Sequence, residues 1–494
     1  MESLSDTKWD VVISGTGLQQ SLLALALSRS GKNILHLDPN DYYGGSEAAF
    51  SLDEADEWAE RHRSTDGPGC FVAAEAKRDA DRLSSRGYSL ALAPQIIHAR
   101  SQLLSQLVSS KAFRQIEFLA VGSFYIYQPA ADPSSSPSLS RIPSTREDVF
   151  SNEAIPAKAK RSLMKFLKFV LDYTSEPQAE VWKPLAEAPL TVLLANHFKL
   201  DSNLQSYIIT LTLSHDGKIT VEAGLATIHR HLTSMGVFGA GFAAVYPKWG
   251  GLAEIAQVGC RAAAVGGAVY MLGTGVKKVD VSSGELLLAI TLTNNMVVSS
   301  KYLTQNSDGT ADDELSLSRL IAVVNSTLPQ FFEITVEGAP SPAVGVVAFP
   351  PGTALDAGGT VSDFPVYGMI HSSDTSECPP GQCVVYLSTV AGAQSKQYLG
   401  KALASLLAVS ADGAESATPL YQLYYEQKVG PPAVHVEKNV VSFRGAAPGL
   451  TFDDSLLELV RRAWENVSDS AIESSVAYMQ FDDREQAEDD DYET

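Results

Sequence analysis

The chain has 494 residues, 45% of them hydrophobic, and a formal net charge of -21. This charge would repel a polyanion, which argues against a nucleic-acid partner and against simple adsorption to anionic membrane surfaces. It fits good solubility or a partner with basic elements. At about 100–200 residues per domain, the length predicts two or three domains.

The cysteines and the apolar stretches indicate the compartment. The four cysteines, Cys70, Cys260, Cys378 and Cys383, show no zinc-site spacing, and so few over this length indicate a reducing environment. The opening residues, MESLSDTKWD, lack the basic and apolar regions of a secretory signal. No stretch has the apolar length of a spanning helix. We therefore expect a cytosolic protein that contacts membranes only transiently.

The first predicted unit is a strand, a turn, a helix and a second strand. Residues 9–14 are apolar and β-branched, a Gly-Thr-Gly turn follows at 15–17, and leucines then recur at helical spacing to about Ser30. Residues 33–37 are predicted to form the second strand, which ends at Asp38. Such a unit implies a parallel sheet and a Rossmann-like α/β fold.

The middle of the chain predicts a helical insert. Residues 51–66 are predicted as helix and loop, 95–121 as helical, 124–127 as a strand and the Pro/Ser-rich 129–139 as a disordered loop. Residues 158–173 form a strongly amphipathic pattern, and 174–236 are mostly helical in character. We therefore expect an all-helical domain at 151–236, inserted in a discontinuous α/β domain at 1–150 and 237–481.

The last part of the chain returns to mixed structure. Residues 250–268 are rich in Gly and Ala and could pack closely on a sheet. Strands are predicted at 276–291, 296–303, 341–349 and 384–389, and helices at 396–407 and 453–466. The acidic residues 482–494 are predicted to be a disordered tail.

The glycine turn leaves two interpretations open. Gly15 and Gly17, with Asp38 ending the next strand, match most of the dinucleotide motif, in which the acid binds the ribose. The third glycine position holds Gln20, and the chain has no Gly-Asp dipeptide, which flavoproteins of this architecture carry on a late strand. The turn therefore predicts the fold with a vestigial nucleotide site and no cofactor, and a flavin-dependent oxidoreductase is the remote alternative.

No other catalytic or metal-binding set emerges from the sequence. It contains no nucleophile elbow, no zinc-protease motif and no phosphate-binding loop. His229 and His231 are two positions apart on a predicted helix, so they cannot share a face. We expect them to be polar surface residues rather than metal ligands.

Two segments carry a resemblance to a known family. Residues 10–45 contain a Gly-Thr-Gly-Leu turn, a Leu-His-x-Asp strand end and Tyr-Tyr-Gly-Gly. They resemble the opening of the Rab escort protein and Rab GDP-dissociation inhibitor superfamily. Residues 246–272 resemble a second segment of that family, in which Tyr-Pro is followed by a Glu and an Arg seven positions apart. The resemblance implies the family's Rossmann-like fold with mixed sheets, and a non-catalytic protein that binds Rab GTPases.

The resemblance also assigns a Rab-binding site. In the family, the second Tyr of Tyr-Tyr-Gly-Gly and the spaced Glu and Arg contact the Rab switch regions. The residues that match these two segments are Tyr42, Tyr43, Gly44, Gly45, Tyr246, Glu254 and Arg261. The spacing alone places Glu254 and Arg261 on one helical face, which is equally consistent with an idle surface ion pair. Two departures are Gly266–Gly267, one position early, and Val269, where dissociation inhibitors tend to have Thr.

Further stretches resemble the escort branch: SEAAFSL at 46–52, IPSTREDVF at 142–150 and PLYQLYYEQ at 419–427. That branch implies a carrier of GDP-bound Rab. It presents Rab to the α/β heterodimer of Rab geranylgeranyltransferase and then shields the attached geranylgeranyl group. A dissociation inhibitor that recycles prenylated Rab is the alternative. The apolar face of the 158–173 helix is a candidate for transferase docking or the lipid cleft, or is simply the core of the insert. It comprises Leu163, Phe166, Leu167 and Val170.

Overall fold

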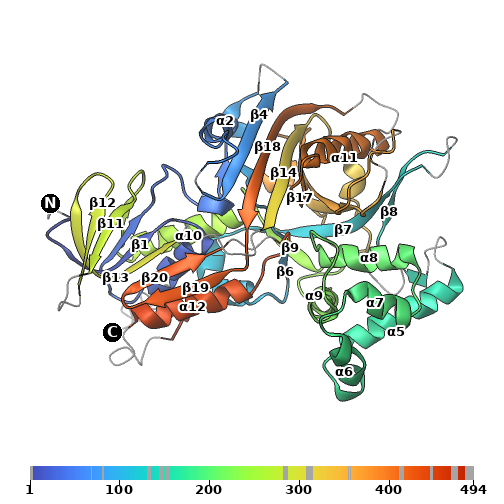
Figure 1. Ribbon diagram of the computed structural model, residues 1–494, viewed down its shortest axis with the longest axis horizontal. Helices are drawn as coiled ribbons and strands as arrows, with labels where there is room; N and C mark the ends of the chain where they lie inside the picture. Colours follow the sequence, from blue (N-terminus) through green and yellow to red (C-terminus); the bar gives the residue numbers. More distant parts are fainter. Residues whose placement is uncertain are drawn as a thin grey trace, which may run out of the picture.

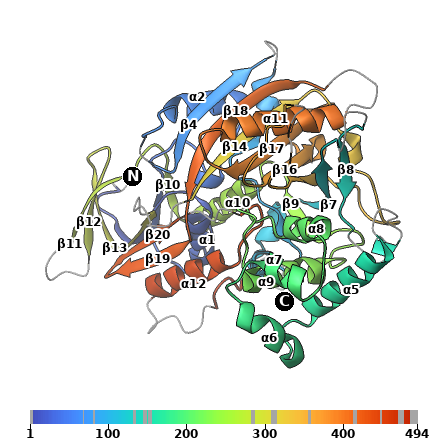
Figure 2. The same cartoon turned by 45° about the vertical axis from the view of Figure 1, so that its right-hand side comes forward.

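The computed structural model describes residues 4–67, 69–79, 83–130, 135–143, 149–150, 156–281, 287–306, 315–353, 355, 358–410, 417–445, 449–468 and 477–483. These residues form two large mixed β-sheets with helices packed on them, a two-stranded sheet of β3 (Ala49–Phe50) and β5 (Leu90–Ala91), and a group of helices at one end (Figure 1). The turned view shows this helical group below the larger sheet and close to it (Figure 2). Part of the predicted loop, 131–134, and most of the predicted tail, 484–494, lie outside the described residues.

The first sheet contains the predicted β-α-β unit. Strand β1 (Lys8–Ser14) pairs in parallel with β2 (Ile34–Leu37) and with β13 (Val297–Asn306), and helix α1 (Leu18–Leu27) connects β1 to β2. In the described residues the sheet has eight strands. The others are β10 (Val269–Met271), β11 (Val276–Val281), β12 (Leu288–Leu292), β19 (Ala433–Glu437) and β20 (Val440–Arg444). Strand β10 pairs with β2 at one edge, and β11 and β12 run antiparallel at the other.

Two helices enclose α1. Helix α10 (Leu252–Val265) and helix α12 (Ser455–Val467) both pack against it. We expected the Gly/Ala-rich segment around α10 to pack on a sheet, but it packs closely on α1. A Cβ at Gly259 would lie 2.6 Å from the backbone oxygen of Ser21, and one at Gly266 would collide with that of Ser28. The glycines are therefore required by a helix–helix contact.

The second sheet is larger and mostly antiparallel. In the described residues it has ten strands, and its longest run is β4-β18-β14-β17-β16-β15-β7-β9-β6. These are β4 (Phe71–Arg78), β18 (Pro419–Val429), β14 (Leu315–Val324), β17 (Cys383–Val390), β16 (Val366–Ser372), β15 (Val344–Phe349), β7 (Phe118–Gln128), β9 (Ala244–Pro247) and β6 (Ile97–His98), with β8 (Ser138–Arg141) beside β7. Helix α11 (Ser395–Val409) packs on β14 and β17, and α2 (Leu52–Arg61) on β4.

A group of helices lies between β8 and β9 in the chain. It comprises α5 (Ala157–Leu171), α6 (Glu176–Trp182), α7 (Leu190–Asn196), α8 (Ser202–Thr212) and α9 (Val221–Ser234). The apolar side chains of α5 point inward, where the ring of Phe166 lies 5.1 Å from that of Phe198. Helices α8 and α9 contact the second sheet through β7 and β6. None of the helices in the described part of the chain combines the length and apolar content of a membrane span.

Two predicted elements differ from the observed ones. Residues 95–121 contain one short α-helix, α3 (Gln102–Ser109), and a 3-10 turn, η3 (Ala112–Gln115), between strands β6 and β7. Helix α3 begins where Ser101 Oγ accepts a hydrogen bond from the N–H of Leu103, and it is followed by Lys111 at φ 63°. The single strand predicted at 276–291 is two antiparallel strands, β11 and β12. Ser-Ser-Gly at 282–284 is a turn signal between the two runs, and the prediction of one strand did not use it.

Candidate functional site

The glycine turn connects β1 to α1 and is held by hydrogen bonds from β2. Gly15 adopts φ 98°, which favours glycine, and its N–H donates to the carbonyl of Leu37 over 2.7 Å. The Nε2 atom of His36 lies 2.7 Å from the carbonyl oxygen of Gly15, and Nδ1 lies 3.0 Å from the hydroxyl of Tyr270 on β10. His36 therefore links the turn to the edge strand of the sheet.

Asp38 holds the loop that follows β2. Its Oδ2 accepts hydrogen bonds from the N–H and the hydroxyl of Thr16, each 2.7 Å long, and its Oδ1 accepts from the N–H of Asn40 over 2.8 Å. Burial raises the pKa of Asp38, and these hydrogen bonds oppose that effect. The N–H of Gly44 donates in turn to Thr16 Oγ1. In a nucleotide-binding fold this carboxylate would bind a ribose. Here it accepts hydrogen bonds from Thr16 and Asn40 instead.

The start of α1 does not fit a dinucleotide phosphate. In nucleotide-binding folds the first N–H groups of this helix face the phosphate. Here the N–H of Leu18 donates to Oε2 of Glu47 over 3.1 Å. A Cβ at Gly17 would lie 3.2 Å from Oε1 of Gln20 and 3.5 Å from Oε2 of Glu47, so these side chains fill the space beside the turn. The chain's own carboxylate caps α1 in place of a ligand.

The Gln20 and Glu47 side chains are themselves anchored. Gln20 donates from Nε2 to Oδ1 of Asn306, at the end of β13. The hydroxyl of Ser46 donates to Oε1 of Glu47 over 2.6 Å. Burial raises the pKa of Glu47, and the hydrogen bonds from Ser46 and Leu18 lower it. Both polar groups therefore have partners where they lie, and neither needs a cofactor for its hydrogen bonds.

In the Tyr-Tyr-Gly-Gly segment, both tyrosine rings lie near another aromatic ring. Tyr42 packs edge-on against Phe50, with 4.8 Å between ring centroids. Tyr43 is half-buried, and its ring lies 6.3 Å from that of Tyr270. Gly44 adopts φ 101°, and a Cβ there would lie 2.9 Å from Cα of Ala48. Gly45 also has a positive φ, 53°, so the backbone at both positions favours glycine.

Helix α10 carries the predicted Glu and Arg on one exposed face. Arg261 Nη2 lies 3.4 Å from Oε1 of Glu254, with 54% and 14% of the two side chains exposed. Partial burial raises the pKa of Tyr43, and the nearby Cys260 and Asp38 add to this effect. Because Cys260 precedes Arg261 on α10, Tyr43 lies close to this helix. We call Tyr43, Glu254 and Arg261 the α10 surface.

Tyr246 lies beneath the α10 surface and is not part of it. Its side chain is completely buried, and its hydroxyl donates to Oε1 of Glu377 over 2.7 Å. A Cβ at Gly251, just before α10, would lie 2.6 Å from that hydroxyl. From this position Tyr246 cannot contact a partner directly, although sequence resemblance placed it in the Rab-binding site. It supports the turn that leads into α10.

Glu377 organises a buried cluster that sequence reasoning missed. Besides Tyr246, it accepts a hydrogen bond from the hydroxyl of Tyr386 over 2.9 Å and lies 2.6 Å from Nδ1 of His371. These residues come from β9, β16, β17 and a loop. Tyr246 is 131 positions from Glu377, whereas His371 and Tyr386 lie within nine positions of it. The four residues share no known motif, so no signal in the sequence pointed to the cluster.

Comparison with known proteins assigns the family. Residues 5–330 match the family described as GDI, the GDP dissociation inhibitors. The chain belongs to this family. It is 31% identical to "Rab proteins geranylgeranyltransferase component A" of Saccharomyces cerevisiae, over 84% of this chain and 68% of that protein. It is 29% identical to the Candida albicans protein of the same name, over 77% of this chain and 59% of the relative.

Solved structures confirm the predicted fold class. The Rab GDI of Plasmodium falciparum superposes with a TM-score of 0.66 at 18% identity, covering 93% of this chain and 98% of that one. An oxidoreductase from Methanosarcina mazei superposes with a TM-score of 0.57 at 12% identity, covering 93% of this chain. At these identities the similarity concerns the fold alone.

The apolar face of α5 packs into the protein's own hydrophobic core. Leu163, Phe166 and Val170 are buried, and Leu167 is half-buried against the same core. A cavity of about 20 Å³, lined among others by Phe124, Leu211 and Met235, lies between the helices and the second sheet. This volume suits one or two water molecules rather than an isoprenoid chain. Lipid binding there would require the helices to separate.

The prediction that His231 is a surface residue is wrong. Its ring is buried 5.6 Å from that of His98 and 5.4 Å from that of Phe124, where α9 meets the second sheet. Burial lowers the pKa of His231 to about 4. His229 is half-buried beside Tyr173. Within the described residues, no cluster of three or more His, Cys, Asp or Glu side chains could hold a metal ion.

Proposed function

We propose that this protein is a Rab escort protein. It binds newly made, GDP-bound Rab GTPases, presents them to the Rab geranylgeranyltransferase α/β heterodimer, and delivers prenylated Rab to membranes from the cytosol. The observation that carries the proposal is the similarity to the yeast component A, which extends over 84% of this chain. The relatives' name describes an accessory component, which supports a role without catalysis.

The α10 surface is the proposed Rab-binding site. Tyr43 offers an aromatic anchor of the kind that dominates protein interfaces, and the half-exposed guanidinium of Arg261 can be redirected to a partner carboxylate. Glu254, more buried, holds Arg261 in place. The hydrogen bonds of Gly44 to Thr16 and of His36 to Tyr270 fix the loop and the edge strand on either side.

The proposed mechanism is presentation of a substrate. The Rab cysteines that receive the lipid lie on a flexible C-terminal tail, which the transferase binds poorly by itself. A carrier that holds the globular part of Rab and also contacts the transferase raises the local concentration of those cysteines. We propose that residues 151–236 act as a separate docking domain for the transferase and later shield the lipid. Each methylene buried there contributes about 0.8 kcal/mol.

A reconstituted prenylation reaction tests this function. GDP-bound Rab, the transferase heterodimer and radiolabelled geranylgeranyl diphosphate are mixed with and without the protein, and lipid incorporation is followed. We expect the initial rate to rise at least about tenfold. A peptide with only the Rab tail is the control and should show no acceleration. An unchanged rate with intact Rab would contradict the escort function.

A dissociation inhibitor is the second candidate. It is favoured by the family match at residues 5–330. Extraction of prenylated Rab from liposomes, without any stimulation of prenylation, would support it over the escort function. The remote candidate, a flavin oxidoreductase, has only the shared fold in its favour. The Glu47 cap on α1 and the engagement of Asp38 argue against it.

A further inference from the structure

Arg319 places a positive charge inside the second sheet. It lies on β14, directly opposite Ser388 on β17 and Tyr425 on β18. Its side chain is on the same face as Leu317 and Ile321, and only 4% of the residue is exposed. The guanidinium at this position is therefore almost completely shielded from water.

This charge has little compensation from the protein. The Nε of Arg319 donates to Oε1 of Gln427 over 2.8 Å. Among the described residues, no carboxylate lies within ion-pair distance of its guanidinium. A guanidinium has five N–H donors, and a buried charge without a partner is strongly unfavourable. The arrangement therefore calls for a negative group at the free side of the guanidinium.

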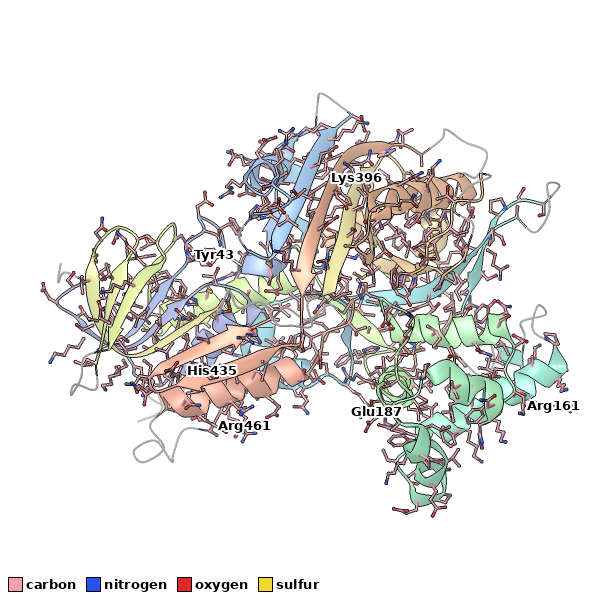
Figure 3. All side chains as sticks on the ribbon, viewed as in Figure 1. Tyr43, Arg161, Glu187, Lys396, His435 and Arg461 are labelled. Carbon is pink, nitrogen blue, oxygen red and sulfur yellow. The ribbon has the colours of Figure 1, made fainter. Side chains whose placement is uncertain are left out.

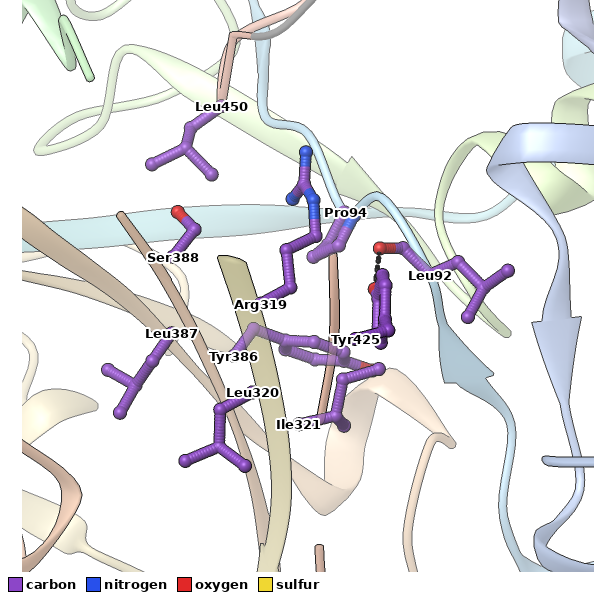
Figure 4. Close-up of a pocket in the computed structure, with 10 residues that line it drawn as sticks. All are labelled: Leu92, Pro94, Arg319, Leu320, Ile321, Tyr386, Leu387, Ser388, Tyr425 and Leu450. Carbon is purple, nitrogen blue, oxygen red and sulfur yellow. Dashed lines mark hydrogen bonds between the residues drawn. The ribbon is translucent and has the colours of Figure 1, made fainter. Parts of the chain in front are cut away.

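A small cavity occupies that side. It has a volume of about 10 Å³ and is lined by Arg319, Ser388, Pro94 and Leu450 among others. Figure 4 shows the guanidinium lying between Ser388 and Pro94, near Leu450. The centre of a water-sized sphere can move through all of this volume, so the space holds one small particle, a water molecule or a monatomic anion. A tetrahedral anion such as phosphate or sulfate has five heavy atoms and needs much more room than this.

A second donor faces the same region. The hydroxyl of Ser388 lies 3.2 Å from Nε2 of His215. Burial, with the nearby charge of Arg319, lowers the pKa of His215 to about 3, so the imidazole is neutral. If Nε2 carries the proton, it donates to Ser388 Oγ, and the Ser388 proton is free to point into the cavity.

We propose that this cavity binds a monatomic halide, chloride in the cell, between the guanidinium of Arg319 and the hydroxyl of Ser388. The ion neutralises the buried charge in a space that excludes larger anions. Because its ligands come from β14 and β17, it crosslinks neighbouring strands of the sheet.

The bound ion also stabilises the junction between the two sheets. The segments that cover the cavity are joined by the N–H of Ile96, which donates to the carbonyl of Leu450 over 2.9 Å. They are joined again by Nε2 of Gln95, which donates to the carbonyl of Gly449 over 2.8 Å. One segment leads into β6 and the other toward α12 on the first sheet. Loss of the ion should therefore lower the stability of the whole molecule.

Thermal unfolding in different sodium salts tests the proposal. At constant ionic strength, replacing gluconate with chloride should raise the midpoint by about 1–3 °C and reach a plateau. R319M removes the charge at similar length and should abolish the chloride dependence. R86M, at an exposed arginine, is the matched control and should retain it. Equal midpoints for the unmodified protein in both salts would overturn the proposal.

Crystals grown in sodium bromide provide a test that does not depend on a variant's folding. We expect an anomalous peak for bromide next to Arg319 and Ser388, and no such peak in S388A if the hydroxyl is a ligand. A cavity without an anomalous peak in the unmodified protein would show that water solvates the guanidinium, and the halide site would be rejected. Neither result depends on Rab binding or prenylation.

Discussion

Arg261 is positioned to bind a partner, and it contributes little to the stability of the fold. Its ion pair with Glu254 is 3.4 Å long and half of its side chain is exposed, so the pair contributes little to stability. We predict that R261A weakens binding of GDP-bound Rab about 5- to 30-fold, which corresponds to about 1–2 kcal/mol. Titration of fluorescently labelled Rab measures this, and the unfolding midpoint should barely change.

Arg461 provides the matched control for Arg261. It forms a similarly exposed ion pair on α12, with Glu465 at 3.1 Å. Figure 3 shows Arg461 well away from Tyr43, on the α12 side of the first sheet. R461A should leave Rab affinity unchanged. Equal affinities for R261A and the unmodified protein would remove Arg261 from the proposed site.

Glu47 should stabilise the protein through the start of α1. Its replacement by Ala leaves the N–H of Leu18 without its partner and removes a negative charge from a helix N-terminus. We predict that E47A lowers the free energy of unfolding by about 1–2 kcal/mol, and that E47Q lowers it less because the amide oxygen can still accept. Urea unfolding measures both.

The control for Glu47 is E57A, at an exposed position on α2, which should change the free energy by less than about 0.5 kcal/mol. Flavin added to E47A should stay unbound, because Gln20 still fills the turn and Asp38 still binds Thr16. Tight flavin binding by E47A would mean that this one side chain is what excludes the cofactor.

At the scale of elements, the contact between α1 and α10 positions the α10 surface. Gly259 allows the two helices to approach, since a Cβ there would lie 2.6 Å from the backbone oxygen of Ser21. We predict that G259A destabilises the protein by about 1–3 kcal/mol and also weakens Rab binding, because α10 must shift. Chemical unfolding and Rab titration measure the two effects.

Gly400 on α11 gives a direct comparison. It is also a helical glycine, but a Cβ there would meet no atom within 4 Å. Alanine has the higher helix propensity, so G400A should stabilise the protein by up to about 1 kcal/mol. Destabilisation of similar size in both variants would contradict the explanation by close packing.

At the scale of the whole molecule, buried histidines should set the response to acid. Burial lowers the pKa of His36 and of His231 to about 4, and that of His215 to about 3. Between pH 6.5 and 4 the unfolded chain binds protons that the folded chain does not, so stability falls as the pH falls. A single histidine shifted from 6.5 to about 4 accounts for up to about 3 kcal/mol at the acid end.

Two carboxyl groups oppose this trend. Burial raises the pKa of Asp38 and of Glu47, so their protonation in the folded state stabilises it as the pH falls. We predict a net loss of unfolding free energy from pH 6.5 to 4.5, measured by urea unfolding across that range. H231L should reduce the slope, whereas H435L, at an exposed residue on β19 labelled in Figure 3, should leave it unchanged. Identical slopes for H231L and the unmodified protein would contradict this.

Elements that depend on local spacing were predictable from the amino-acid sequence. The β-α-β unit, the helix of residues 158–173 and the shared face of Glu254 and Arg261 all follow from periodicity within one segment, and the structure contains each of them. The motif around Gly15 was also enough for the fold class. Gln20 at the third glycine position was a local departure from the nucleotide motif, and its side chain lies beside Gly15 and Gly17.

The packing of distant segments sets which side chains face solvent and which meet across the chain. It placed Tyr246 and His231 in the interior, Glu47 at the start of α1, and Arg319 inside the second sheet. In each case the deciding contact joins residues that are distant in sequence, such as Tyr246 with Glu377 and Arg319 with Gln427. Local periodicity carries no information on such contacts, because burial depends on what the rest of the chain packs against each face.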